Sequence, residues 1–195
     1  MSGVQLLIPF YLEYSLGLNP LFSGLVMASY PIVYFMTSLF AGPASDRIYP
    51  PTLVFAGIAL GGVASLAFSI FLKLDMILIT ICFMMILGVC FGLFFSPGNK
   101  YMMSIPKPEN LGAASGAIST VGLIGASVGL VVFETVFSLS MPPHDSFLHG
   151  KSSVEGFSRS LDGAFTNALV AGTILCIISA AFAAYLIIRK RAGNT

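Results

Sequence analysis

The chain has 195 residues, of which 56% are hydrophobic and 9% are charged, and its formal net charge is +1. A water-soluble domain of this length would leave much of its apolar surface facing solvent, so the composition excludes an ordinary soluble fold and indicates an integral membrane protein. The near-neutral charge favours neither a nucleic-acid partner nor a basic anchor on the membrane surface.

Six apolar stretches, separated by polar or Pro- and Gly-rich breaks, divide the chain. Their predicted limits are residues 3–15, 21–41, 52–72, 76–97, 113–138 and 163–188. A helix needs about 20 residues, at ~1.5 Å each, to cross a hydrocarbon core of ~30 Å. The last five stretches reach this length. They predict an all-α fold of membrane-spanning helices that form one unit over residues 1–195.

The first stretch is too short to cross the membrane. Residues 2–15 give a rise of only about 21 Å, and Met1 falls where the middle of a span would be. We therefore expect a truncated first helix in a six-helix half-bundle. The chain would then be either a fragment of a longer protein or a subunit that a partner chain completes.

The distribution of basic residues predicts the orientation in the membrane. If the loops alternate between sides, one side holds Arg47, Lys100, Lys107, Arg189, Lys190 and Arg191, and the other holds Lys73, Lys151 and Arg159. The positive-inside rule places the richer side in the cytoplasm. Both chain ends, including a tail over residues 189–195, are then expected to be cytoplasmic at an inner (plasma) membrane. Residues 139–162 are expected to form an outer loop.

Neither a metal site nor a cofactor is expected. His144 and His149 stand five residues apart in the polar outer loop, and two histidines in a flexible loop make a poor metal site by themselves. The cysteines, Cys82, Cys90 and Cys176, lie inside apolar stretches and are expected to be small buried hydrophobic residues. The sequence contains no nucleotide-binding loop and no nucleophile with a neighbouring base, which argues against an enzyme. Any transport would draw its energy from an ion gradient or from the solute.

Small residues recur at helical spacing in three of the stretches. The glycines among them are Gly57, Gly61, Gly88, Gly92, Gly122, Gly125 and Gly129. In the fifth stretch Ser115, Ser119 and Ala126 share the face of Gly122 and Gly129, because steps of three and four residues keep them on one side of a helix. Such faces allow helices to approach closely. Static packing explains each of them, and three in one chain also suit helices that slide or rock.

Two carboxylates, Glu13 and Glu134, lie within apolar stretches near their outer ends. An ionisable group in apolar surroundings is costly, and it can exchange a proton when its access to water changes. Both are therefore candidates for proton coupling or cation binding. The alternative is that each lies within about one turn of the membrane interface and simply reaches water. Glu134 lies about 120–140° around its helix from Gly122 and Gly129, so it points away from that face.

Aromatic and polar residues on three stretches are candidates for a surface that binds a ligand. They are Gln5 and Pro9 on the first stretch, Tyr30 and Tyr34 on the second, and Phe95 and Asn99 at the end of the fourth. Pro9 removes the backbone hydrogen bond to the Gln5 carbonyl, which predicts a bend with a polar side. Such surfaces can hold a flat or lipophilic ligand. Ordinary helix packing is the alternative for each residue taken alone.

A short pattern between the second and third stretches resembles a known signature. Gly42-x-x-x-Asp46-Arg47 is similar to the Gly-x-x-x-Asp-Arg loop signature of the major facilitator superfamily. That signature normally continues with Gly and further basic residues. Here the chain continues with Ile48-Tyr49-Pro50-Pro51, so the basic half is missing. The resemblance implies that Gly42, Asp46 and Arg47 form a gating loop in which Asp46 holds neighbouring helix ends together, but it does not say which helix Asp46 meets.

Further segments resemble the carboxy-terminal half of the fourteen-span drug/proton antiporters of this superfamily. They are Pro9 to Glu13, Leu16 to Pro20, Phe95 to Asn99, Gly112 to Gly116 and Gly125 to Gly129. The resemblance implies two bundles of six spans that hold a substrate between them and rock to open the cavity to alternate sides. It also implies that the first and fourth spans of a bundle line the cavity. The residues so placed near the substrate are Gln5, Pro9, Glu13, Phe91 and Phe95.

These features together predict the carboxy-terminal bundle of a proton-coupled exporter of lipophilic or cationic compounds. Its expected partners are the lipid bilayer, protons, a small substrate, and either an amino-terminal bundle or a second copy of the chain. A non-transporting membrane interaction protein, including a truncated relic, is one alternative. A facilitator of small metabolites on the same scaffold is another. Sparse Asn, Gln and Arg within the stretches disfavours polyol recognition, which needs many fixed hydrogen bonds.

Overall fold

The computed structural model of the chain describes residues 2–71, 77–140 and 154–192. In these ranges the chain forms six α-helices and no strand. The elements are α1 (Ser2–Phe10), a π-helical turn η1 (Tyr11–Ser15), α2 (Pro20–Arg47), α3 (Pro50–Phe71), α4 (Ile77–Met103), a 3₁₀ turn η3 (Pro108–Asn110), α5 (Leu111–Ser140) and α7 (Val154–Ala192). Five of the helices, all except α1, contain a segment long and apolar enough to cross a membrane. The chain is therefore an all-α, multi-pass membrane protein.

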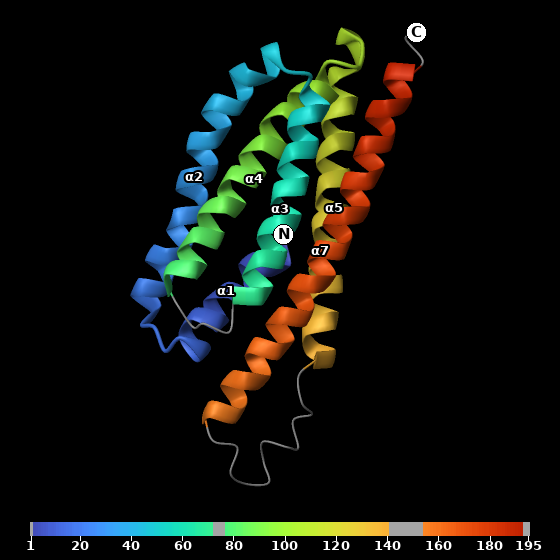
Figure 1. Ribbon diagram of the computed structural model, residues 1–195. Coiled ribbons are helices and arrows are strands. Elements are labelled where there is room, and N and C mark those ends of the chain that lie inside the picture. Colours follow the sequence, from blue (N-terminus) through green and yellow to red (C-terminus); the bar gives the residue numbers. More distant parts are fainter. Residues whose placement is uncertain (1, 72–76, 141–153, 193–195) are drawn as a thin grey trace.

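The helices stand side by side in a bundle (Figure 1). α4 packs against both α2 and α3, α3 also packs against α7, and α7 packs against α5. α1 lies in the lower half of the bundle in Figure 1 and packs against α5, while η1 contacts α7. Because α3 runs back between them, α2 and α4 run in the same direction. We call the end where α2 and α4 finish the Asp46 end, and the opposite end, where η1 leads into α2, the Glu13 end.

The apolar core lies toward the Glu13 end, where α1 and η1 enter the bundle. Ile8 and Tyr11 are fully buried there. The Tyr11 ring lies 6.4 Å from that of Phe68 on α3 and 5.3 Å from that of Phe165 on α7. The Phe68 ring in turn stacks on Phe83 of α4 at 4.0 Å. The first helix and its π turn therefore join α3, α4 and α7 through one aromatic cluster.

Backbone geometry fixes the connection from η1 to α2. The Leu16 N–H donates to the Tyr11 carbonyl at 3.2 Å, which is the five-residue bond of a π turn. Gly17 follows with a φ of 63°, a left-handed conformation that glycine adopts without steric cost. Asn19 then caps α2 by accepting a hydrogen bond from the Leu21 N–H at 3.2 Å. The chain thus turns back into the membrane within a few residues.

Glycines let α4 lie directly against the neighbouring backbones. A Cβ atom added at Gly88 would lie 2.7 Å from the Tyr30 carbonyl oxygen, and one added at Gly92 would lie 2.6 Å from the Thr37 Cβ. On α3, a Cβ added at Gly57 would lie 2.8 Å from a backbone carbonyl of α4. These distances are shorter than real Cβ contacts, so a larger residue at any of the three positions would push the helices apart.

The small-residue face of α5 was expected to pack closely against a neighbouring helix, and it does not do so. No atom lies within 4 Å of a Cβ added at Gly122, Gly125 or Gly129, so this face packs against no helix in the described part of the chain. α1 does lie close to α5 at Phe133, where a Cβ added at Gly3 would lie 2.6 Å from the Phe133 side chain. The prediction that this face approaches a neighbour is therefore wrong for contacts among the described residues.

Two predicted helix ends are also wrong. The segment Gly42 to Arg47, expected to be a loop, forms the last turns of α2. Likewise, α4 continues through Pro97 as far as Met103. A proline within a membrane helix frees one backbone carbonyl, and neighbouring helices and hydroxyl side chains compensate for the loss, so it need not end the helix.

The predicted outer loop over residues 139–162 is shorter than expected. α5 continues to Ser140 and α7 begins at Val154. The stretch from Val154 to residue 162 contains no proline, so nothing in it prevents the helix from starting early. Residues 141–153, which include both histidines, lie outside the described residues. At its other end α7 runs to Ala192 and takes in most of the predicted tail.

The contact between α4 and α2 can be tested by adding one methyl group. We expect Gly88→Ala to destabilise the folded chain by about 1–3 kcal/mol, because the new Cβ meets a backbone oxygen that cannot move aside. The matched control is Gly125→Ala, whose Cβ meets open space. Thermal unfolding in detergent micelles measures both changes. Equal melting temperatures for the two variants would contradict the close contact.

Candidate functional site

Three aromatic rings form a cluster at the contact between α2 and α4. The Tyr30 and Tyr34 rings lie 6.4 Å apart and nearly parallel, with an interplanar angle of 8°. The Phe91 ring stands edge-on to both, at 5.7 Å and 6.4 Å. A step of four residues keeps the two tyrosines on one face of α2. The close approach at Gly88 and Gly92 then brings Phe91 of α4 beside them.

A cavity of about 430 Å³ opens beside this cluster, between α1, α2 and α4. Its lining residues are Gln5, Met27, Ala28, Tyr30, Pro31 and Met84. Most of the lining is apolar. The side-chain polar groups are the Gln5 amide and the Tyr30 hydroxyl, which are close enough to interact. This lining suits a flat or lipophilic small molecule, because apolar area supplies affinity and a few polar groups fix the orientation.

The structure brings four of the predicted cavity residues together. Gln5 and Tyr30 line the cavity, and Tyr34 and Phe91 stand at its aromatic edge. The other three lie farther along their helices. These are Pro9, about one turn beyond Gln5 on α1, and Phe95 and Asn99, about one and two turns beyond Phe91 on α4 toward the Asp46 end.

Two methionines, Met27 and Met84, line the cavity although the sequence pattern did not single them out. Helical spacing could have identified both from the sequence. Met27 precedes Tyr30 by three positions and Met84 precedes Phe91 by seven, so each methionine shares a helix face with an aromatic candidate. Methionine is unbranched and flexible, so it adapts to ligands of different shape.

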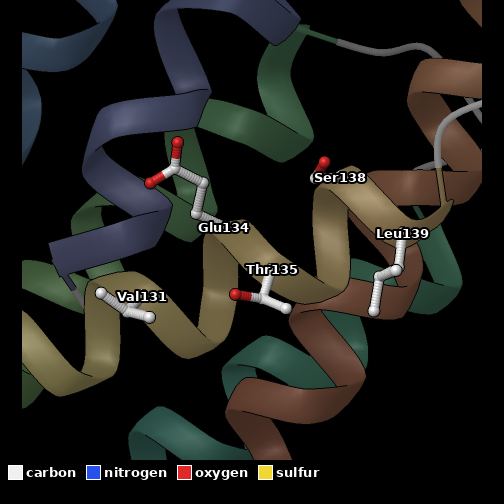
Figure 2. Close-up of a pocket in the computed structure, with 5 residues that line it drawn as sticks. All are labelled: Val131, Glu134, Thr135, Ser138 and Leu139. Carbon is white, nitrogen blue, oxygen red and sulfur yellow. The ribbon is translucent and has the colours of Figure 1, made fainter.

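A second hollow, of about 330 Å³, lies on α5 near its Glu13 end (Figure 2). Val131, Glu134, Thr135, Ser138 and Leu139 line it. Figure 2 shows the Glu134 and Ser138 side chains on the same side of α5. Glu134 is exposed and forms no ion pair with any residue that the structure describes. A carboxylate in a membrane span without a fixed cationic partner is available to bind a proton or a cation.

The other carboxylate, Glu13, lies in the π-helical turn η1 and is half-buried. Single π turns are frequent at functional sites. Glu13 lines neither the hollow around Glu134 nor the cavity beside Tyr30. Over residues 2–71, 77–140 and 154–192, no group of three or more His, Cys, Asp or Glu side chains could hold a metal ion. The two carboxylates are therefore separate candidates.

At the Asp46 end, the carboxylate of the signature segment has a partner on α4. Asp46 accepts a hydrogen bond from the Lys100 ammonium in an ion pair. Beside it, the Tyr49 and Tyr101 hydroxyls lie 3.5 Å apart and their rings 6.0 Å apart. Arg47 is exposed at the end of α2. The helix that Asp46 meets, left open by the sequence, is thus α4. From the sequence alone, Lys100 is predicted only to be a charge on the cytoplasmic side.

The fold and these sites define a multi-pass membrane protein with a ligand-sized cavity between its helices. The sequence profile of the Major Facilitator Superfamily matches residues 1–130, which is most of the chain. The chain belongs to the major facilitator superfamily.

Its similarity to known proteins points the same way. The chain is 28% identical over 152 residues to the riboflavin transporter RibZ of Clostridioides difficile, a match that covers 74% of the chain and 32% of that protein. It is 32% identical over 123 residues to the uncharacterized transporter YebQ of Escherichia coli, covering 63% and 27%. It is 27% identical over 138 residues to the multidrug efflux pump LfrA of Mycolicibacterium smegmatis, covering 71% and 27%.

The matched regions cover less than a third of the length of these relatives. No solved structure matches the chain. Because all three relatives are named as transporters, the relationship points to a transport role rather than to catalysis.

The contact across the cavity between α1 and α2 can be measured with a double-mutant cycle. We expect Gln5→Leu and Tyr30→Phe to be coupled by about 0.5–1.5 kcal/mol of unfolding free energy, the usual net contribution of one hydrogen bond. The matched control pairs Gln5→Leu with Tyr34→Phe, since Tyr34 is a turn farther from Gln5 and should show no coupling. Unfolding in detergent supplies the four free energies of each cycle. Additive effects in both cycles would mean that Gln5 and Tyr30 do not interact.

Proposed function

We propose that this chain is one bundle of a secondary transporter that exports lipophilic or cationic compounds by alternating access, coupled to protons. The observation that carries the proposal is the cavity between α1, α2 and α4 with its aromatic edge. A mostly apolar lining suits a lipophilic ligand, and the faces of tyrosine rings attract organic cations. Support also comes from the similarity to LfrA, which is named as a multidrug efflux pump.

The complete transporter would need a second wall opposite this cavity. We assign that wall to an amino-terminal bundle or to a second copy of the chain. The relatives are more than three times as long as the part they share with this chain, which leaves room for such a bundle. Few residues of the apolar segments in α2 and α5 are buried within the bundle.

The orientation proposed for the bundle follows its charges. The Asp46 end carries Arg47, Lys100 and Lys107, so the positive-inside rule places it in the cytoplasm of an inner (plasma) membrane. The Glu13 end then faces outward. In this orientation the segment Gly42 to Arg47 lies at the cytoplasmic side, where the family resemblance implies a role in gating.

Glu134 and Glu13 are the proposed proton carriers. Glu134 lies toward the same end of the bundle as Glu13. Its carboxylate lines an open hollow together with the hydroxyl side chains of Thr135 and Ser138. A carboxylate so placed can take up a proton from one side and release it after the bundle has rocked.

A planar, uncharged ring compound is the second candidate substrate. The observation that favours it is the pair of nearly parallel tyrosine rings, whose faces offer stacking area. One relative, RibZ, is named as a riboflavin transporter. The two substrate classes differ in charge, so a pair of fluorescent probes can separate them.

Binding can be tested without transport. We expect the purified chain in lipid nanodiscs to bind ethidium, a planar cation, and Phe91→Ala to weaken that binding about five- to tenfold, because one aromatic contact is lost. Riboflavin serves as the uncharged probe in a parallel fluorescence titration. The control is Phe182→Ala, an exposed ring on α7, a helix that does not line the cavity. If Phe91→Ala and Phe182→Ala bind both probes as the unchanged chain does, the cavity is not the binding surface.

Proton coupling can be tested in the host cell that carries the chain. We expect Glu134→Gln to abolish ethidium efflux driven by the pH gradient while leaving ethidium binding in nanodiscs intact, because an amide cannot carry a proton. Glu13→Gln is measured in the same way. The control carboxylate is Glu109, exposed in η3, and Glu109→Gln should leave efflux unchanged. Normal efflux in both the Glu13 and the Glu134 variants would remove these residues from the coupling mechanism.

A further inference from the structure

The cavity between α1, α2 and α4 has very few polar groups with which to orient a ligand. Of the described residues that line it, none carries a charge, and only Gln5 and Tyr30 have polar side chains. Its volume of about 430 Å³ lies within the usual range for sites that hold a small molecule. A ligand in this cavity would therefore form its polar side-chain contacts with Gln5 and Tyr30, and most of its surface would meet apolar groups.

The Gln5 amide has more hydrogen-bonding groups than Tyr30 can satisfy. Besides Tyr30, the amide has no partner in the part of the chain that the structure describes. A glutamine amide can donate two hydrogen bonds and accept two. A single hydroxyl cannot pair with all four positions, so at least one N–H and one lone pair of the carbonyl oxygen remain, whichever way the amide is turned. Leaving such groups unpaired beside a ligand in an apolar cavity is costly.

A cyclic amide is the chemical group that pairs with both remaining positions at once. Lactams and imides carry an N–H beside a C=O, so the N–H can donate to the Gln5 carbonyl oxygen while the C=O accepts from the Gln5 N–H. The same two-bond geometry lets glutamine read a neighbouring donor and acceptor on the edge of a nucleobase. An isolated carbonyl or hydroxyl on a ligand would satisfy only half of the amide.

The aromatic edge of the cavity favours a flat ligand. The Tyr30 and Tyr34 rings lie 6.4 Å apart and nearly parallel, and the Phe91 ring stands edge-on to Tyr30 at 5.7 Å. A planar ring system gains contact by stacking on such faces. Met27 and Met84 supply adaptable apolar surface elsewhere in the cavity. Different residues therefore recognise the plane of the ring and the polar edge of the ligand.

We propose that the cavity binds planar, uncharged ring compounds that carry a cyclic amide, and that Gln5 is the residue that selects them. In this role Tyr30 is a positioning residue, because its hydroxyl holds the Gln5 amide in place. The inference rests on the proposed function, since it names the substrate class of the same cavity. An organic cation would meet ring faces here but no carboxylate among the described lining residues.

Two probes that differ by one methyl group test this selection in the unchanged chain. Phenanthridinone is a planar, uncharged lactam with the three-ring skeleton of ethidium, and N-methylphenanthridinone has its N–H capped. We expect the purified chain in lipid nanodiscs to bind phenanthridinone about three- to tenfold more tightly, the usual contribution of one neutral hydrogen bond. Fluorescence titration measures both affinities, and empty nanodiscs correct for uptake by lipid.

The sign of the difference separates amide recognition from apolar contact. The added methyl group increases apolar area, so apolar contact alone predicts tighter binding of the capped probe. Equal affinities, or tighter binding of N-methylphenanthridinone, would therefore overturn the proposal without any change to the chain.

Replacing Gln5 tests whether this side chain makes the selection. Gln5→Met keeps the length of the side chain and removes the amide, so it should abolish or reverse the preference for phenanthridinone. Tyr30→Phe, which keeps the ring and removes the hydroxyl, is a second variant and should lower the preference. The matched control is Asn110→Leu, which removes an exposed amide in η3 and should keep the full preference. A preference that survives in both Gln5→Met and Tyr30→Phe would overturn the role of Gln5.

Ethidium binding, measured on the same samples, distinguishes this inference from the proposed function. Binding of ethidium without a preference between the two lactam probes would overturn selection by Gln5 and leave the proposed function standing. A clear preference for phenanthridinone without ethidium binding would support the selection and remove organic cations from the proposed substrates. Binding of none of the three probes would overturn both.

Discussion

The close contact of α4 with the backbone of α2, made possible by Gly88 and Gly92, is the constraint on which the other features depend. Apolar side chains gain little by leaving lipid for another helix, so helices in a membrane associate through close packing and interhelical hydrogen bonds. Gly57 adds a second close approach, between α3 and α4. α4 is thereby held between two neighbours. This position brings Phe91 beside Tyr30 and sets one wall of the cavity.

Different kinds of side-chain contact hold the helices together at the two ends of the bundle. At the Glu13 end, buried aromatic side chains such as Tyr11 and Phe165 join the first helix to the others. At the Asp46 end, α2 and α4 are joined through small residues, one ion pair and two tyrosines. Contacts of the second kind are weak individually and sensitive to charge. The contacts at the Asp46 end therefore depend on charge and on ionic strength, whereas those at the Glu13 end do not.

Much of the site was predictable because it follows helical periodicity. Tyr30 and Tyr34, one turn apart, do share a face at the cavity, and Gln5 does meet it from α1. The predictions were wrong where a rule about a single helix does not hold for a helix packed in the bundle. Pro97 does not end its helix, and the small residues around Gly122 face open space. A membrane helix continues past a proline because its freed carbonyl finds other partners, and a helix face carries no information about which neighbour is present.

Hydropathy, length and the spacing of side chains are properties of a segment alone, so the number of spans, the apolar class and the faces of each helix could be derived from the residues in order. The pairing of those faces is a property of the whole bundle. The partner of Asp46, 54 positions away on α4, and the register that aligns Gly42 with Ser96 emerge only when two helices are placed against each other. The physical reason is that contact energies in a membrane depend on fit between surfaces, and that fit exists only in the assembled fold.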